Sequence, residues 1–144
     1  MTNEKILHVT NKELFYAAVM LGVQQLVNVL YDYPASEAQF GKELEDVKKT
    51  LRMKKLLTES ARTGVSMDFA LAMCATFCAE PESCEVVASE GYDATVYTAA
   101  GMHMLLERRP GDELAALWFQ ERKNLDQYLE GKLKKKEAGD DGGV

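Results

Sequence analysis

The spacing of hydrophobic residues changes once along this chain, from a helical period to a strand period. Before Pro81, apolar residues recur three and four positions apart, which places them on one face of an α-helix. After Pro81, they alternate with polar residues, as in a strand with one buried face. A chain of 144 residues is long enough to bury helices and strands in one core. We therefore expect an α+β fold.

Three helices are predicted before this change. Thr10, with a glutamate three residues later, has the spacing of a capping box, so the first helix begins just after it. Gly22 either ends this helix or lies inside it, because the helical pattern continues beyond it. Ser36, with a glutamine three residues later, precedes a second helix of about 16 to 20 residues. Ser66 and Asp68 are suited to cap a third helix.

Three strands and a last helix are predicted after the change. The strands cover about residues 84–88 and 94–99 and a segment that begins at Met102, and short turns join them. Asp112 is the expected N-cap of the last helix, and Gly131 is its expected end. The predicted order is three N-terminal helices, a three-stranded antiparallel β-meander and a C-terminal helix, with the helices on one side of the sheet.

We expect one α+β domain over residues 1–131 and a disordered tail over residues 132–144. The tail is rich in lysine, then in aspartate and glycine, and its few apolar residues do not offset the entropy lost on ordering. The chain as a whole has 17 basic and 23 acidic residues and a net charge of −6. This balance disfavours nonspecific binding to nucleic-acid phosphates and to anionic lipid, so we expect neither partner.

The cysteines indicate a reducing compartment. Cys74, Cys78 and Cys84 lie in a chain that is large enough to fold without disulfides. Cys74 and Cys78 share one helix face, but a zinc site takes about four ligands and only His8 and His103 remain to supplement them. We therefore predict no metal and no cofactor, and we interpret the two thiols as small apolar core groups.

One apolar segment has the composition of a targeting sequence. Phe15 to Val23 follows acidic residues and is far shorter than the ~20 residues of a membrane-spanning helix. We therefore expect a protein that keeps its N-terminus, has no membrane partner and works in the cytoplasm.

Enzymatic motifs give little support for catalysis. The sequence contains no G-x-G-x-x-G, P-loop, H-E-x-x-H, G-x-S-x-G or C-x-x-C pattern. His103 is the best candidate acid or base, but a strand histidine that faces solvent is several times more common and is the favoured interpretation. An enzyme that uses His103 with Cys84 requires the two side chains to lie on one face of the sheet and within hydrogen-bond reach. We expect no catalytic residue and no enzyme.

One basic cluster supports an alternative function. Three helices followed by a hairpin is also the order of a winged helix, in which such a cluster would contact DNA phosphates. Residues 66–79 contain no Arg, Lys, Asn or Gln, the side chains with which a recognition helix reads bases. A winged-helix-like regulator of nucleic acid is therefore the alternative hypothesis. The cluster consists of Lys48, Lys49, Arg52, Lys54 and Lys55.

Apolar side chains are more numerous than one sheet face requires. The third strand places large apolar side chains on one face and Leu105 on the other, and Trp118 and Phe119 cannot point the same way. Either all of them pack in one core or some form a surface that binds a partner protein. The candidate partner contacts are Tyr97, His103, Leu105, Trp118 and Phe119.

Several stretches together match a known pattern of element order. They are Asn11–Ala17 with Leu21–Gly22, Leu51–Leu57, Met67–Phe77, Cys84–Ala88, Thr95–Tyr97 and Met102–Arg108. As a pattern of hydrophobic positions over about residues 10–130, they resemble the EspG-like secretion chaperones of type VII secretion systems.

The resemblance implies an α+β fold and a cytosolic, non-enzymatic role. Proteins of this family bind one cognate substrate, keep it soluble and help to deliver it for export. Their substrates are helical proteins in actinobacteria and large antibacterial toxins in Firmicutes. Longer members carry two related halves, whereas this chain has room for one, so a surface built across both halves is either missing or restored by a homodimer. The expected function is thus a cytosolic, substrate-specific chaperone or adaptor for a type VII secretion substrate.

Overall fold

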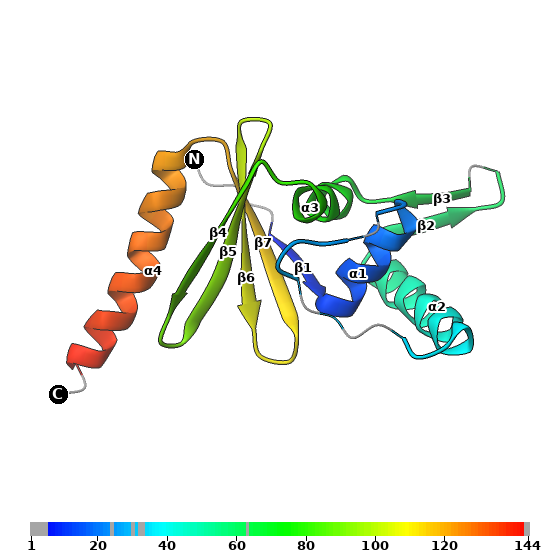
Figure 1. The fold of residues 1–144 in the computed structure, drawn as a ribbon, viewed down its shortest axis with the longest axis horizontal. Helices are drawn as coiled ribbons and strands as arrows, with labels where there is room; N and C mark the ends of the chain where they lie inside the picture. The colour runs from blue at the N-terminus through cyan, green and yellow to red at the C-terminus, as the bar shows by residue number, and fades with distance from the viewer. Residues whose placement is uncertain (1–5, 24, 30, 32–33, 63, 143–144) are drawn as a thin grey trace. The chain divides into compact units, whose positions relative to one another are not determined.

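The computed structural model describes residues 6–23, 25–29, 31, 34–62 and 64–142. The chain divides into two compact units, which we call the helical unit, residues 9–80, and the sheet unit, residues 1–8 and 81–144. Figure 1 shows the elements of both units. In the described residues, no helix is both long enough and apolar enough to cross a membrane.

Helices and one hairpin build the helical unit. Its elements are α1 (Asn11–Met20), α2 (Glu37–Met53), β2 (Leu57–Ser60), β3 (Gly64–Met67) and α3 (Phe69–Ala79). Helix α1 packs against both α2 and α3, and Leu14, Leu51 and Leu71 are fully buried. Strands β2 and β3 pair antiparallel, with Leu57 opposite Met67.

The three predicted helix starts are confirmed by their caps. The Thr10 hydroxyl accepts a hydrogen bond from the backbone N–H of Glu13 at 3.0 Å, and the Glu13 carboxylate accepts one from the backbone N–H of Thr10 at 2.9 Å. The Ser36 hydroxyl accepts from the backbone N–H of Gln39 at 3.1 Å, and the Asp68 carboxylate accepts from the backbone N–H of Ala70 at 2.9 Å. Each bond satisfies a donor that the first turn of a helix leaves without an intrahelical partner.

A five-stranded sheet and one helix build the sheet unit. Its elements are β4 (Ser83–Ser89), β5 (Tyr92–Ala99), β6 (Met102–Arg109), β7 (Glu113–Phe119) and α4 (Arg122–Gly142), and β1 (Leu7–Thr10) completes the sheet. The strand order is β1-β7-β6-β5-β4, and strands β4 to β7 pair antiparallel. Ala100 and Gly101 both have positive φ, 52° and 77°, which gives the two-residue turn between β5 and β6.

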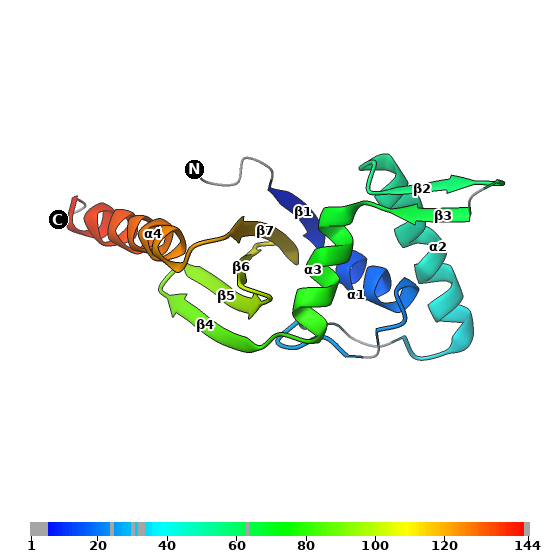
Figure 2. The same cartoon turned by 90° about the horizontal axis from the view of Figure 1, so that it is seen from above.

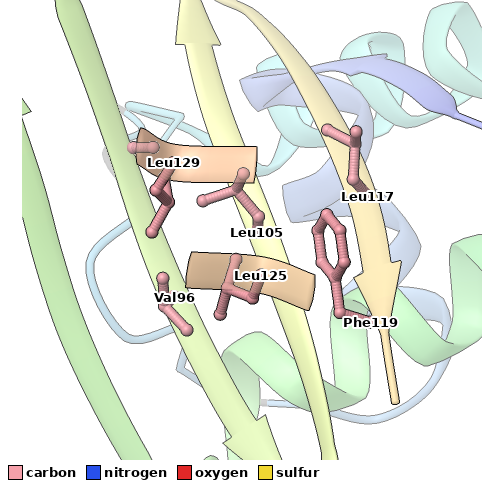
Figure 3. Packing of buried hydrophobic residues seen from close by; sticks show 7 residues of the cluster. Val96, Leu105, Leu117, Phe119, Leu125 and Leu129 are labelled. Atoms are coloured by element: carbon pink, nitrogen blue, oxygen red, sulfur yellow. The ribbon is translucent and has the colours of Figure 1, made fainter. Parts of the chain in front are cut away.

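Helix α4 covers one face of this sheet. Val96, Leu105 and Leu117 lie opposite one another on three neighbouring strands. Figure 3 shows them, with Phe119, packed against Leu125 and Leu129 of α4, and these side chains form one buried cluster. Burying a side chain of this size stabilises a fold by roughly 1.5–3 kcal/mol, so the cluster is what holds α4 to the sheet.

The predicted layout of three N-terminal helices, a three-stranded meander and a C-terminal helix is wrong, although the structure is α+β. The strands expected near residues 84–88, 94–99 and 102 lie within β4, β5 and β6. However, β1 precedes the first helix, and the hairpin β2–β3 separates α2 from α3. Four-residue strands as short as these leave little periodicity in a sequence.

The largest error concerns the segment after Asp112. We expected Asp112 to cap a helix, but it has a φ of 61° and lies in the turn that leads into β7. Residues 114–119 are buried on both faces of the strand, so they form a continuous apolar run that a helix pattern also fits. The last helix begins at Arg122 and continues past Gly131, the expected end, to Gly142. The prediction of one domain over residues 1–131 with a disordered tail over 132–144 stays a prediction.

Candidate binding pocket

Residues 21–36 connect α1 to α2 with little regular secondary structure in the described part. Connections longer than about 12–15 residues are uncommon in compact domains and usually have a function. Gly22 follows the end of α1 with a φ of 80°, which settles its place outside the helix. The backbone N–H of Val27 donates to the carbonyl of Cys78 in α3 at 2.6 Å and so ties this segment to the helical unit.

An open pocket lies between α1, this segment and the start of α2. It has a volume of about 470 Å³. Its walls are almost entirely apolar, since Gln25 and the Tyr31 hydroxyl are the polar side-chain groups among its lining residues, and most of the lining side chains are half-buried. The lining residues are Phe15, Ala18, Val19, Val23, Gln25, Leu26, Val29, Tyr31, Pro34 and Phe40.

Aromatic rings form part of the wall. The ring of Phe15 stacks on that of Tyr31, with 4.5 Å between centroids and 28° between planes. Tyr16, fully buried behind them, meets Phe15 edge to face at 5.0 Å and Phe40 at 5.4 Å. Offset and edge-to-face pairs are the favoured arrangements of aromatic rings, so these contacts fix the orientation of Phe15 and Tyr31.

A carboxylate of α2 holds the two tyrosines. Tyr16 donates its hydroxyl hydrogen to Glu43 Oε1 at 2.8 Å, and Tyr31 donates to the same oxygen. Gln39 donates to the other oxygen of Glu43 at 2.9 Å. These hydrogen bonds lower the pKa of Glu43 to about 2, and the bond from Tyr31 has the largest effect. The pKa of Tyr16 is raised, mainly by burial and then by its hydrogen bond to Glu43. Near neutral pH, the Glu43 carboxylate therefore stays charged and acts as a clamp on Tyr31, not as a proton donor.

A second carboxylate joins α1 to α2. Glu13 is buried and accepts hydrogen bonds from Thr50 at 2.7 Å and from Lys54 at 2.5 Å. Burial by itself raises the pKa of Glu13, but the hydrogen bonds from Lys54, Thr50 and the Thr10 backbone together lower it below its usual value. Glu13 thus serves as helix cap and interhelical ion pair at once.

This ion pair bears on the basic cluster that favoured a nucleic-acid function. Lys54 is bound to Glu13, Arg52 is bound to Glu59, and Lys48 lies 3.8 Å from Glu45. Three of the five cations therefore have an acidic partner in the structure. The hairpin β2–β3 lies between α2 and α3, so the three helices are not consecutive as that alternative assumed, although the hairpin β4–β5 does follow α3.

The five predicted partner contacts lie in the sheet unit and divide between its two faces. Leu105 and Phe119 belong to the cluster under α4, and His103, on the same face, lies with its Nδ1 2.8 Å from the Thr98 hydroxyl. Tyr97 and Trp118 lie on the opposite face, each across from Met104. Apart from His103, these side chains are buried. Their role as partner contacts stays a prediction.

The register of strands β4 to β6 tests the hypothesis of an enzyme that uses His103 with Cys84. Cys84 lies opposite Tyr97 and so shares its face, whereas His103 is on the face of α4. The two side chains therefore do not form the pair that this alternative requires.

The sequence analysis did not identify the pocket. Its residues come from α1 and from an irregular segment, so they follow neither a helical nor a strand period. The available signal was the length of the connection together with the apolar residues that it contains, Val23, Leu26 and Val29 among them.

Comparison with known proteins gives no family assignment. No family model matches the chain, and no curated protein matches it. Any function therefore rests on the pocket and on the sequence pattern.

Proposed function

We propose that this protein is a chaperone or adaptor that binds an apolar segment of a client protein in the pocket of the helical unit. The observation that carries the proposal is the open, apolar wall formed by α1 and residues 21–36. Half-buried side chains such as Phe15, Val19 and Leu26 lose further water contact when an apolar segment covers them. Each Å² of apolar surface so buried contributes roughly 25 cal/mol.

The polar groups of the pocket favour a protein segment over a small molecule. Small-molecule sites combine apolar walls with several placed polar groups that orient the ligand. Here the Tyr31 hydroxyl already donates its hydrogen to Glu43, so among the described lining residues the Gln25 amide is the side-chain group that can donate a hydrogen bond to a ligand. The net charge of −6 favours a segment without acidic residues beside it.

The class of client comes from the sequence resemblance. A type VII secretion substrate, such as an antibacterial toxin, is the client that an EspG-like chaperone implies. The proposed place of action is the cytoplasm, where such a client is held before export and where the cysteines stay reduced.

The test compares two substitutions of apolar residues in the same unit. Leu26→Glu places a charge in the pocket wall, whereas Met53→Glu places one at the end of α2, where Met53 is 78% exposed and does not line the pocket. The tagged protein and both variants are used to capture partners from the source cytosol, and the bound proteins are identified by mass spectrometry. We expect one near-stoichiometric client on the wild type and on Met53→Glu, and its loss from Leu26→Glu with folding unchanged by circular dichroism. Equal capture by Leu26→Glu and the wild type would show that the pocket is not the client site.

A further inference from the structure

Strand β4 forms one edge of the five-stranded sheet, and among the described strands it pairs with β5 alone. Figure 2 shows it at the end of the sheet. It has seven residues, and all but Val87 are exposed. Soluble proteins usually protect such an edge by keeping the strand short or by placing charged residues, lysine above all, or proline in it, and β4 carries one charged residue, Glu85. Strand β4 contains no lysine and no proline, and its length exceeds the four residues of β1 at the other edge.

The turn after β4 determines which backbone groups point outward. Glu90 and Gly91 form a two-residue turn, flanked by Ser89 opposite Tyr92. The two residues that close such a turn, here Ser89 and Tyr92, are joined to each other by two backbone hydrogen bonds. Along an antiparallel pair of strands, such hydrogen-bonded pairs alternate with pairs that are not hydrogen-bonded to each other. Every second residue, counted back from Ser89, therefore bonds to β5. The residues between them, whose N–H and C=O groups point away from β5, are Cys84, Val86 and Ala88.

We infer that β4 pairs antiparallel with β4 of a second copy of this chain, with Val86 opposite Val86 of the partner subunit. The strand reads Ser-Cys-Glu-Val-Val-Ala-Ser, so in this register its residues lie opposite ones of similar size, except that Glu85 lies opposite Val87. Serine lies opposite serine at the ends, and Cys84 lies opposite alanine. Val86, which is 64% exposed in one copy, is covered by its counterpart.

The charge inside β4 is compatible with this register. Glu85 is the one charged residue of β4, and Arg122 binds it with guanidinium nitrogens 2.5 and 3.3 Å from its two oxygens. Within the strand, the single charge of Glu85 is thus paired with a cation, and the acidic residues Glu82 and Glu90 lie just beyond its two ends. With Val86 at the centre, Glu85 faces Val87, whereas moving the centre to residue 85 would place the two Glu85 side chains opposite each other. The self-pairing thus satisfies the outward backbone groups without opposing like charges inside the strand.

Substitutions of Val86 test both the pairing and its register. Because residue 86 faces itself, Val86→Lys and Val86→Asp each oppose like charges, and we expect each to weaken association about tenfold or more. An equimolar mixture of the two variants opposes an ammonium to a carboxylate and should restore a dimer. Val86→Thr keeps a neutral β-branched side chain, and Val65→Lys changes an exposed valine of β3, so both should leave the dimer intact.

The measurement is sedimentation equilibrium of the full chain and of each variant, with circular dichroism to confirm folding. A wild type that stays monomeric up to its solubility limit would overturn the inference, including the case in which β4 is paired by a client strand instead. So would a dimer that Val86→Lys leaves unchanged, because its interface would lie elsewhere. Two monomeric variants that do not associate on mixing would overturn the register. The test uses no client and is therefore independent of the proposed function.

Discussion

At the scale of single residues, both units use a carboxylate to hold two tyrosines. Glu43 accepts from Tyr16 and Tyr31 in the helical unit. In the sheet unit, the buried Glu107 accepts from Tyr92 at 2.7 Å and from Tyr128 at 3.0 Å. Burial, followed by the nearby charge of Glu107, raises the pKa of Tyr128 to about 12, so this phenol also stays neutral. In each unit, one anion thereby fixes two large rings whose own contacts are mostly apolar.

The Glu43 clamp predicts a specific pH dependence of stability. The pKa of Glu43 falls from its ordinary value of 4.5 to about 2 on folding, so its bonds stabilise the fold fully above pH 4.5 and lose effect as the pH falls toward 2. We expect Glu43→Gln to lower the melting temperature at pH 7 and to lower it much less at pH 3. Thermal melts followed by circular dichroism measure both differences. Glu45→Gln, at a more exposed position of α2, is the control, and an equal loss for Glu43→Gln at both pH values would contradict the clamp.

At the scale of elements, what the sequence predicts well depends on interactions between near neighbours. The caps at Thr10, Ser36 and Asp68 each join residues two or three positions apart, so their signal survives in the sequence. Strand β7 was missed because burial on both faces removes the alternation that marks a strand. The pocket was missed because long-range bonds, such as that from Val27 to Cys78, set the path of its wall.

The packing of α4 gives a prediction at this scale. Leu125 is fully buried between α4 and the sheet, so Leu125→Ala leaves a cavity and removes apolar contacts. The expected loss in the free energy of unfolding is about 2–5 kcal/mol, measured by urea denaturation. Gln127→Ala, at an exposed position of the same helix, should change it by no more than about 0.5 kcal/mol. A loss below about 1 kcal/mol for Leu125→Ala would mean that α4 is not held by this cluster.

At the scale of the whole molecule, the two proposed surfaces belong to different units. The pocket lies in the helical unit and the β4 edge in the sheet unit. Self-pairing through β4 therefore leaves the pocket lining unused, and each dimer carries two pockets. Two linked pockets that engage one client hold it more tightly than either alone, provided that the client can reach both.

The charge around β4 predicts how this association responds to salt. The register that pairs Val86 with itself brings Glu82 near Glu90 of the partner subunit at both ends of the strand, and each copy carries a net charge of −6. These charges repel, and screening lengths fall from about 30 Å at 0.01 M salt to about 8 Å at 0.15 M. We therefore expect association, measured by sedimentation equilibrium, to strengthen over this range. Glu90→Gln should reduce the salt dependence more than Glu45→Gln, which removes the same charge from α2. Association that weakens as salt is added would indicate that opposite charges attract each other across the interface, and the proposed β4 pairing contains no such pair.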